Sequence, residues 1–349
     1  MIFAFNGRKN TANHPENNKR FAVFFLLSVF LTISAFAKSN NPVYVHENRL
    51  WTLEKTGDSV ITKPLADRKI PFKARNIGGS LENLCVWDSA GEKLLFFDKK
   101  RNLKPQVSLK GGLVRTNGKF LYAVGKNFEN KGFNFSFYEI KKSFFRKKSL
   151  KKLFEAELDC FVSDTVFSEK GIWFCGGNKD DTSNSVYFAD FSALNVRKLF
   201  ETEKKSDFLR LIIADKAANS VYSFQSGRIK HNGVYKLYEI SENSSANTID
   251  LSACEDFPEN AAGMFGFGLS YKNQLLLPVS TDNSQISVLV YDTESGQIVK
   301  TFQNSNGIFL PVGQYDSRAF YIAKDPIDNP DYSALLYYDG SGFGTLKKY

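Results

Sequence analysis

The sequence predicts an all-β protein built from repeated four-stranded sheets, because a pair of short apolar strands recurs seven times along the chain. The first strand of each pair usually follows Asn, Gly, Lys or Ser, and the second mostly ends in Asp or Glu. The pairs recur at intervals of about 35 to 54 residues, a spacing typical of a radial array of small sheets, since one such sheet cannot bury both faces alone. The predicted fold is therefore a β-propeller, with seven blades as the simplest count.

The paired strands are expected in the middle of each blade. First strands begin at Asn48, Asn83, Gly118, Gly171, Asn219, Asn273 and Ser317. Second strands begin at Asp58, Lys93, Phe133, Ser185, Gly233, Gln285 and Ser333. Most second strands end in an acidic residue just before a tight turn. Its carboxylate can accept hydrogen bonds from the backbone N–H groups of that turn. We therefore expect this row of acids to be structural.

Each unit also has room for an outer and an inner strand. Outer strands are expected at 105–109, 151–157, 197–203, 248–252, 297–302 and 345–349. Inner strands are expected at 72–77, 112–116, 160–167, 208–215, 264–270 and 308–315. Six blades is the alternative, with residues 43–75 as a partial blade or closing strand, because the first two intervals are the shortest. Ring closure by packing of the first blade on the last, or by strand exchange, stays open.

Two segments resemble blade units of known propellers. Residues 83–104, NLCVWDSAGEKLLFFDKKRNLK, resemble an NHL-type unit, and residues 287–302, SVLVYDTESGQIVKTF, are similar to YVTN-type and quinoprotein-like units. Each match covers one blade and implies shared blade geometry rather than a shared activity. The resemblance therefore indicates the β-propeller superfamily and no specific family.

The N-terminus has the pattern of a secretory signal. Lys19 and Arg20 precede an apolar run from Phe21 to Ala37, and small residues close the run. We expect a signal helix and cleavage after Ala37, which makes 1–37 a signal peptide and 38–349 a single propeller domain. An uncleaved signal anchor is the alternative. The predicted location is the periplasm and cell envelope, or the medium after secretion.

Charge and residue usage exclude several function classes. The formal net charge is +9, of which +3 lies in residues 1–37, and the modest excess that remains does not indicate nucleic-acid binding. Outside the leader only His46 and His231 remain, which leaves no multi-histidine metal site or His-based triad. Four cysteines without a CxxC motif allow three disulfide connectivities and indicate no redox or zinc site. No cofactor, no resident metal and no catalytic residue is predicted.

The loops between first and second strands are the predicted binding surface, since variable loops on a repeated scaffold usually carry binding. Acidic clusters in two of these loops could hold a hard cation, but their spacing matches no EF-hand, and solvated turns are the expectation. The candidate binding residues are Phe128, Asp180, Asp181, His231, Asp325, Asp328, Asp331 and Tyr332.

A basic segment between two strands of the third unit is a second candidate surface. Basic residues around paired aromatic rings can dock on anionic lipid or polysaccharide, and a solvated turn is the alternative. The residues are Lys141, Lys142, Phe144, Phe145, Arg146, Lys147, Lys148, Lys151 and Lys152.

The predicted function is non-catalytic binding of a protein partner or envelope glycan by an exported, monomeric propeller, with membrane association through the signal anchor or the basic segment as a further possibility. One alternative is a hydrolase or lyase acting on a sugar or lactone through channel-mouth carboxylates such as Asp164 and Asp215. This chemistry needs two carboxylates within about 5 to 10 Å of each other. The other alternative is a structural protein of the envelope.

Overall fold

The computed structural model describes residues 41–47, 49–65, 74–78, 84–88, 90–97, 103–111, 113–127, 132–142, 148–178, 182–202, 209–213, 220–226, 235–264, 266–281, 286–304, 308–324 and 333–349. The chain divides into two units, Met1–Phe30 and Leu31–Tyr349, and every described residue belongs to the second. The segment 1–37, predicted as a signal peptide, lies outside the described residues.

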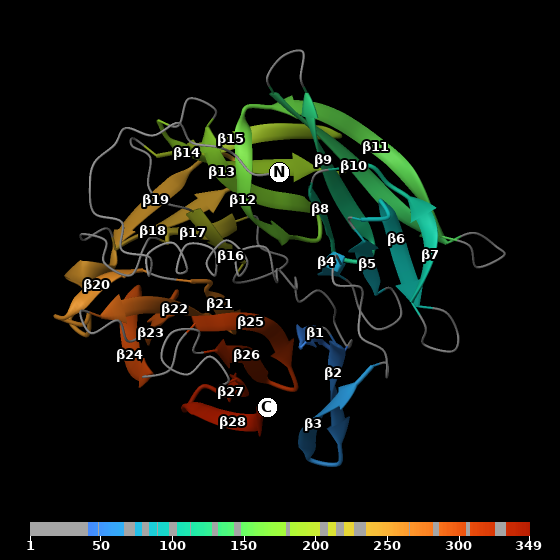
Figure 1. The fold of residues 1–349 in the computed structure, drawn as a ribbon. Helices are drawn as coiled ribbons and strands as arrows, with labels where there is room; N and C mark the ends of the chain where they lie inside the picture. Colours follow the sequence, from blue (N-terminus) through green and yellow to red (C-terminus); the bar gives the residue numbers. More distant parts are fainter. Residues whose placement is uncertain are drawn as a thin grey trace, which may run out of the picture. The chain divides into compact units, whose positions relative to one another are not determined.

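Seven antiparallel sheets follow one another along the chain and form the blades of a β-propeller (Figure 1). Blade 1 contains β1 (Val43–His46), β2 (Arg49–Thr56) and β3 (Ser59–Pro64). Blade 2 contains β4 (Ala74–Gly78), β5 (Cys85–Asp88), β6 (Lys93–Phe97) and β7 (Leu103–Ser108). Blade 3 contains β8 (Leu113–Thr116), β9 (Phe120–Asn127), β10 (Gly132–Lys142) and β11 (Lys148–Leu158). Blade 4 contains β12 (Cys160–Phe167), β13 (Gly171–Asn178), β14 (Asn184–Asp190) and β15 (Asn195–Glu201).

The remaining three blades continue this order. Blade 5 contains β16 (Leu209–Ile212), β17 (Ser220–Gln225), β18 (Lys236–Ser241) and β19 (Ala246–Asp250), followed by the short helix η1 (Leu251–Ala253). Blade 6 contains β20 (Ala261–Met264), β21 (Leu269–Tyr271), β22 (Gln274–Thr281), β23 (Ile286–Asp292) and β24 (Gln297–Asn304). Blade 7 contains β25 (Ile308–Tyr315), β26 (Arg318–Lys324), β27 (Ser333–Tyr338) and β28 (Phe343–Lys348).

The predicted propeller and its seven blades are confirmed, while the expectation of four strands in every blade is wrong for two of them. Blade 1 has three described strands, and its inner strand β1 was not predicted. Blade 6 has five, because β20 and β21 both pair with β22 as two halves of an inner strand. Gly266 lies between the halves with a φ of 102°, a conformation that glycine adopts at little steric cost and that interrupts the strand.

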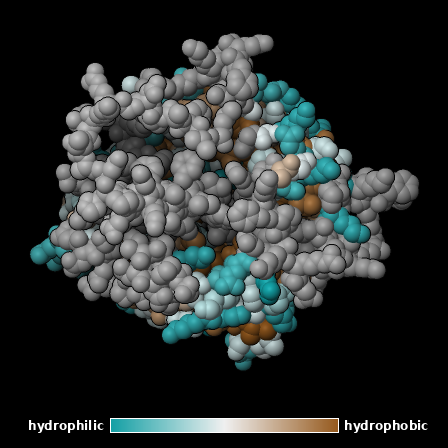
Figure 2. Space-filling model, viewed as in Figure 1, coloured by the Kyte–Doolittle hydropathy of each residue, from teal (hydrophilic) through white to brown (hydrophobic). Residues whose placement is uncertain are grey.

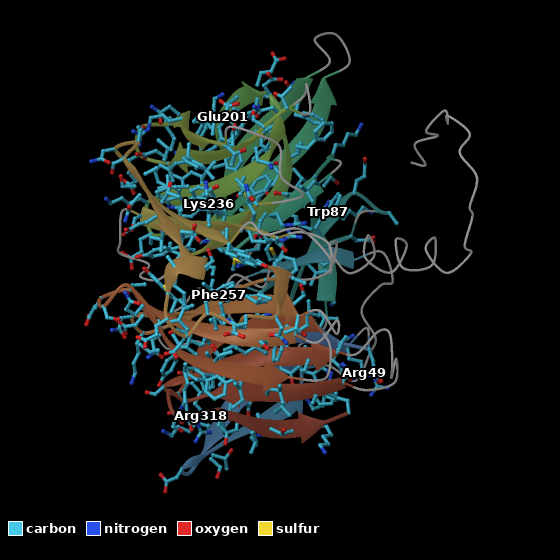
Figure 3. All side chains as sticks on the ribbon, turned by 90° about the vertical axis from the view of Figure 1, so that its left-hand side faces the viewer. Arg49, Trp87, Glu201, Lys236, Phe257 and Arg318 are labelled. Atoms are coloured by element: carbon cyan, nitrogen blue, oxygen red, sulfur yellow. The ribbon has the colours of Figure 1, made fainter. Side chains whose placement is uncertain are left out.

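Both faces of each blade are buried against its neighbours, which explains why the paired strands are almost continuously apolar. Trp87 on β5, labelled in Figure 3, packs in a cluster with Val114 and Leu121 of blade 3. Trp173 on β13 packs with Leu209 of blade 5 in the same manner. These two tryptophans therefore serve inter-blade packing, as expected of aromatic residues in strands.

The acidic residues that end the second strands accept hydrogen bonds from the backbone of the turns that follow them. Asp190 Oδ1 accepts from the backbone N–H groups of Ser192 and Ala193 at 2.7 and 2.9 Å. Asp292 and Asp339 make equivalent pairs of bonds to the two turns that follow them. The repeated carboxylates thus stabilise hairpins, as their spacing predicts.

Ring closure joins blade 7 to blade 1 through side chains, and in the described part of the chain each of these sheets contains only its own consecutive strands. The residues of this closure seam are Tyr44, His46, Trp51, Lys55, Tyr315, Asp316, Ser333, Lys347 and Tyr349. The ring of Tyr349 packs on His46 with centroids 3.7 Å apart, and its hydroxyl hydrogen-bonds that of Tyr44 at 2.6 Å. Of the two modes of closure that the sequence left open, the structure shows packing.

The four cysteines are free thiols, and Cys85, Cys160 and Cys175 are buried. Burial raises the pKa of Cys85 to about 11 and that of Cys160 to about 12, so both remain protonated at neutral pH. Among the described residues, no helix has the length and apolar character needed to cross a membrane.

Candidate functional site

The predicted loop residues do not fall in the described part of the chain. Phe128, Asp180, Asp181, His231, Asp325, Asp328, Asp331 and Tyr332 all lie outside the described residues. Figure 2 shows mainly hydrophilic side chains, with smaller hydrophobic areas between them, where described residues reach the surface on the face in view. The candidate site is therefore built from residues that flank the predicted loops.

The basic segment is described in part. Phe144, Phe145, Arg146 and Lys147 lie outside the described residues, and Lys142 is described in its backbone alone, as part of β10. Lys141 forms an ion pair with Glu139 at 2.7 Å, and Lys152 forms one with Glu155. Lys148 lies 5.2 Å from the centre of the Phe96 ring of blade 2, and Lys151 is exposed on β11. Two of these charges are thus balanced within the blade.

One end of blade 4 brings together groups that suit ligand binding. Strand β12 starts there, β13 ends there, β14 starts there and β15 ends there, so this end carries the loops predicted to bind. The groups are an aromatic pair and a network of polar side chains. We call this surface the blade-4 end, defined by Phe133, Phe161, Asn178, Ser183, Ser185, Lys198, Glu201 and Thr202.

The aromatic pair consists of Phe161 on β12 and Phe133 on β10 of blade 3. Their rings meet edge to face, with centroids 4.6 Å apart and planes at 62°. Phe161 is 57% exposed, and its partner across the ladder is Gly177, which has no side chain to cover it. A large ring held at its edge by another ring and open elsewhere is a rigid apolar surface for a ligand to stack on.

A close backbone approach holds β12 in this position. A Cβ atom on Gly176 would lie 1.7 Å from the carbonyl oxygen of Phe161, so no side chain fits there. Further along β12 the register shifts between Val162 and Asp164, which places a bulge at Ser163. Such bulges redirect side chains at the edges of sheets, and here the bulge directly follows the exposed ring.

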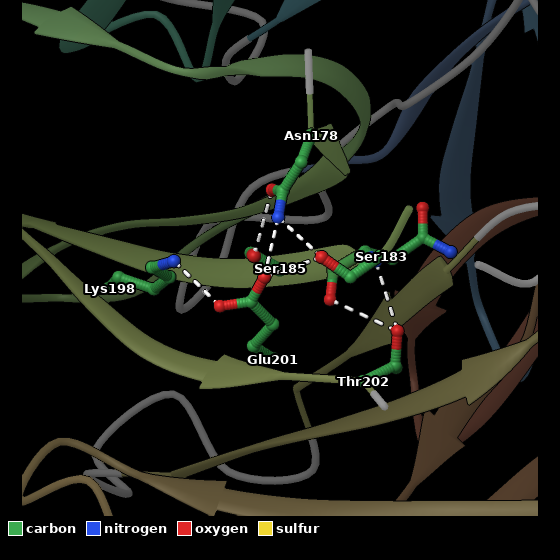
Figure 4. A network of polar contacts seen from close by, with 7 residues as sticks. Asn178, Ser183, Ser185, Lys198, Glu201 and Thr202 are labelled. Carbon is green, nitrogen blue, oxygen red and sulfur yellow. Dashed lines mark hydrogen bonds and ion pairs between the residues drawn. The ribbon is translucent and has the colours of Figure 1, made fainter. Parts of the chain in front are cut away.

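The polar network of the blade-4 end centres on Glu201, as Figure 4 shows. Glu201 Oε1 accepts from Asn178 Nδ2 at 2.5 Å and from the hydroxyl of Ser183, while Oε2 pairs with Lys198 Nζ at 2.7 Å. Ser185 Oγ donates to Asn178 Oδ1 at 3.0 Å. Beside this network, Thr202 Oγ1 accepts from the backbone N–H of Asn184 at 3.0 Å.

The electrostatics of the network favour an ionised carboxylate. Lys198, and next Ser183, hold the pKa of Glu201 below its ordinary value of 4.5. The Glu201 and Lys198 side chains are 41% and 46% exposed, so water or a ligand hydroxyl can exchange with their present partners. The blade-4 end thus offers oriented acceptors and donors close to an open aromatic ring.

The network and the aromatic pair share one end of blade 4, although the ladder register places Ser185 and Phe161 on opposite faces of its sheet. Ser185 and Tyr187 alternate along β14 onto one face, and Tyr187 packs in the cluster that blades 3 and 4 share. Phe133 borders that cluster from blade 3. The two parts of the blade-4 end therefore flank the junction of blades 3 and 4.

Asp164, the carboxylate considered for catalysis, serves the junction between blades 4 and 5. Its Oδ1 accepts from the Thr165 N–H at 2.8 Å and its Oδ2 from the Leu211 N–H on β16 at 3.0 Å. Burial raises the pKa of Asp164, while the charge of Arg210 and the two N–H donors oppose that rise. Asp215 lies outside the described residues. The oxygens of Asp164 are thus committed to joining two inner strands.

The blade-4 end overlaps one of the loops predicted to bind, but none of its residues was among the binding residues predicted from the loops. Asn178, Ser183 and Ser185 belong to the loop segment 176–185 that was predicted to bind, but Phe161 and Glu201 lie in strands predicted as inner and outer. No local pattern distinguishes Phe161 from a core aromatic residue, because its exposure depends on Gly177 across the ladder. Among the described residues, no cluster of three His, Cys, Asp or Glu could hold a metal ion.

Comparison with known proteins supports the fold. No family model matches the sequence, and no curated protein matches it. An oligogalacturonate lyase in complex with manganese has a TM-score of 0.55 at 10% identity, covering 91% of this chain and 86% of that chain. The oligogalacturonate lyase of Vibrio parahaemolyticus has a TM-score of 0.54 at 10% identity, covering 88% and 85%.

A prolyl endopeptidase also matches, with a TM-score of 0.55 at 12% identity, covering 88% of this chain and 49% of that chain. The chain spans about half the length of the peptidases that it matches. Propeller lyases and peptidases are therefore among the structural neighbours, and at these identities the likeness shows the fold alone.

Proposed function

We propose that this chain is an exported, non-catalytic β-propeller that binds a glycan of the cell envelope at the blade-4 end. The observation that carries the proposal is the exposed ring of Phe161, which is braced by Phe133 at the same end of the blade as the Glu201 network. Export follows from the signal pattern of residues 1–37 and would bring the protein to envelope polymers.

The chemistry of a sugar fits both halves of this surface. The axial C–H groups of a pyranose form an apolar face that can lie on an aromatic ring, while its hydroxyls donate and accept around the rim. Glu201 supplies acceptors for such hydroxyls and Lys198 supplies donors, because both side chains are partly exposed. Pockets for small molecules usually combine apolar contact with a few placed polar groups in this way.

A protein partner is the other candidate ligand class from the sequence. A stable protein interface buries about 800 Å² on each partner and centres on several large anchors. The described part of the blade-4 end offers one strongly exposed ring and a small polar network, which suits a ligand of one or two sugar rings better. Binding of a protein in place of the sugar is an outcome that the experiment below detects.

Catalysis is the second function class that the sequence raised, and propeller lyases are among the structural neighbours. An acid and base pair of carboxylates would have to meet in space. Asp164 binds two backbone N–H groups across the junction of blades 4 and 5, so its oxygens face the scaffold. We therefore propose binding through Glu201 and Phe161 rather than chemistry at Asp164.

The test is a screen of neutral and acidic oligosaccharides against the protein purified after export, followed by calorimetric titration of the best binder. Phe161→Ala should weaken binding about two- to tenfold, because an aromatic stacking contact contributes about 0.5–1.5 kcal/mol. Glu201→Gln should weaken it several-fold, and wild-type affinity should stay level between pH 7 and 5, since the pKa of Glu201 is held below 4.5.

Val299→Ala is the matched control, because Val299 on β24 is also a large exposed apolar residue, at 47%. Its affinity should equal that of the wild type. Retention of full affinity by Phe161→Ala, or binding of envelope proteins and no oligosaccharide, contradicts the proposal. Release of shorter sugars during the titration would revive the enzyme alternative.

A further inference from the structure

The closure seam has no shared ladder of backbone hydrogen bonds among the described residues. Contacts of side chains hold blade 7 against blade 1, and among them the Tyr315 hydroxyl accepts from the Lys55 backbone N–H at 3.1 Å. Covalent loops connect every other pair of neighbouring blades. A ring closed in this way opens when the contacts of a few side chains weaken. The chemistry of the closure seam therefore decides when the ring opens.

His46 lies at the centre of this seam. Its side chain is 3% exposed, and its ring packs against Tyr349 at 3.7 Å. Its Nε2 is 3.5 Å from Ser333 Oγ on β27, a distance at the limit of a hydrogen bond. Its Nδ1 is buried with no hydrogen-bond partner among the described residues. A neutral imidazole fits this site, whereas an imidazolium would bury an N–H donor without an acceptor.

The charges around His46 also disfavour its protonation. Blade 7 contributes Lys324 on β26 and Lys347 on β28, and both lower the pKa of His46. On its own side, Glu47 lies 3.7 Å from Nε2 with a side chain 77% exposed, and the partner of His46 across the ladder is Arg49. Tyr44, Trp51 and Tyr349 complete the surroundings as neutral rings. A proton on His46 would thus add positive charge to a site already facing two lysines.

We propose that His46 is an acid-sensitive latch, so that its protonation separates blade 7 from blade 1 and opens the ring while the other blades remain folded. This inference is independent of the proposed glycan site, which lies on blades 3 and 4. It assigns a regulatory role to the closure seam.

The direction of the pH effect follows from linkage. Burial, and next Lys324, lower the pKa of His46 from 6.5 to about 4, so the open state takes up the proton first. Closure is therefore fully favoured above pH 6.5 and weakens as the pH falls toward 4. Across this window the opening equilibrium shifts by up to about 300-fold, since each pKa unit is a factor of ten.

The test is hydrogen exchange by mass spectrometry at pH 7 and pH 4.5, with rates corrected for intrinsic exchange. Wild-type peptides from β1–β3 and β25–β28 should lose protection at pH 4.5, while β12–β15 keep theirs. His46→Phe retains a ring against Tyr349 and should abolish the acid response of the seam. Lys324→Met removes an opposing charge and should move the response toward that of His46→Phe.

Ser333→Ala is the control for loss of the weak Nε2 contact, and it should keep the wild-type response. The proposal is wrong if His46→Phe remains as acid-sensitive as the wild type, or if blade 4 loses protection together with blades 1 and 7. Because Lys324→Met leaves His46 in place, it tests the latch even if His46→Phe folds poorly.

Discussion

Two junctions between neighbouring blades, that of blades 4 and 5 and the closure seam of blades 7 and 1, are held together by different kinds of contact. At the first junction, Asp164 accepts two backbone N–H groups, one from each inner strand, and Arg210 Nη1 donates to the Ser163 carbonyl at 2.8 Å. At the closure seam, Tyr349 packs on His46 and Trp51, and Lys347 lies 4.2 Å from the Trp51 ring. At the first junction a buried carboxylate binds backbone groups beside the apolar cluster around Trp173, whereas aromatic and cation–π contacts predominate at the closure seam.

The position of each junction in the chain accounts for this difference. Strands β12 and β16 contact each other as inner strands and present backbone groups at the edges of their sheets. Buried N–H groups must find acceptors, and a carboxylate supplies two. Arg210 also stacks on Phe267 of blade 6 at 4.2 Å, which extends this junction to a third blade. The closure seam joins two ends of the described chain and relies on aromatic area and cation–π contacts.

Asp164→Ala, at the junction of blades 4 and 5, should produce the largest loss of stability. It leaves the N–H groups of Thr165 and Leu211 without their acceptor and removes the charge that interacts with Arg210. Removing one partner from a buried charged network costs about 3–5 kcal/mol, and we expect a loss of that size in the free energy of unfolding. Urea titration followed by far-UV circular dichroism measures it.

Asp190→Ala is the control for Asp164→Ala, since Asp190 also accepts two backbone N–H groups but at an exposed turn. It should cost about 1 kcal/mol, as expected of a lost capping bond. Equal losses in the two variants would show that burial at the junction of blades 4 and 5 adds nothing.

Tyr349→Ala should produce the next largest effect, because it removes the ring that contacts both His46 and Trp51 at the closure seam. We expect a loss of about 3 kcal/mol, at the lower end for truncating a buried aromatic residue, since Tyr349 is half-buried. Tyr349→Phe keeps the ring and loses the bond to Tyr44, for about 1 kcal/mol. Thermal unfolding of both variants separates the contribution of ring packing from that of the hydrogen bond. If Tyr349→Phe is as unstable as Tyr349→Ala, packing of the aromatic ring does not stabilise the seam.

The fold could be predicted from sequence because its signals are local. Seven strand pairs with buried apolar runs, and acids such as Asp292 before tight turns, repeat often enough to identify blades. The strand β1 was missed because its four residues, Val43 to His46, follow the predicted leader and lack a preceding partner of the repeat. The split of β20 from β21 depends on the backbone at Gly266, which hydrophobic pattern does not report.

The candidate site and the latch depend on contacts between blades, which no local pattern reports. Phe161 alternates like any strand residue, and only its glycine partner and the Phe133 ring make it an exposed platform. His46 and Tyr349 are more than 300 residues apart in sequence, so their stacking requires the closed ring. Sequence patterns predict which loops flank the candidate site, and packing between blades determines which residues meet there.

The smallest expected effect comes from the exposed rim of the closure seam. Lys55 Nζ pairs with Asp316 Oδ1 at 2.7 Å, and this pair joins blade 1 to blade 7 at the surface. Lys55→Met should lower the unfolding midpoint less than Tyr349→Phe does, because exposed ion pairs contribute little and are screened. At 0.5 M salt the difference from the wild type should vanish, since screening then acts within a few ångströms. A salt-independent loss of stability as large as that of Tyr349→Ala would mean that the exposed Lys55–Asp316 pair, rather than the aromatic side chains, holds the propeller closed.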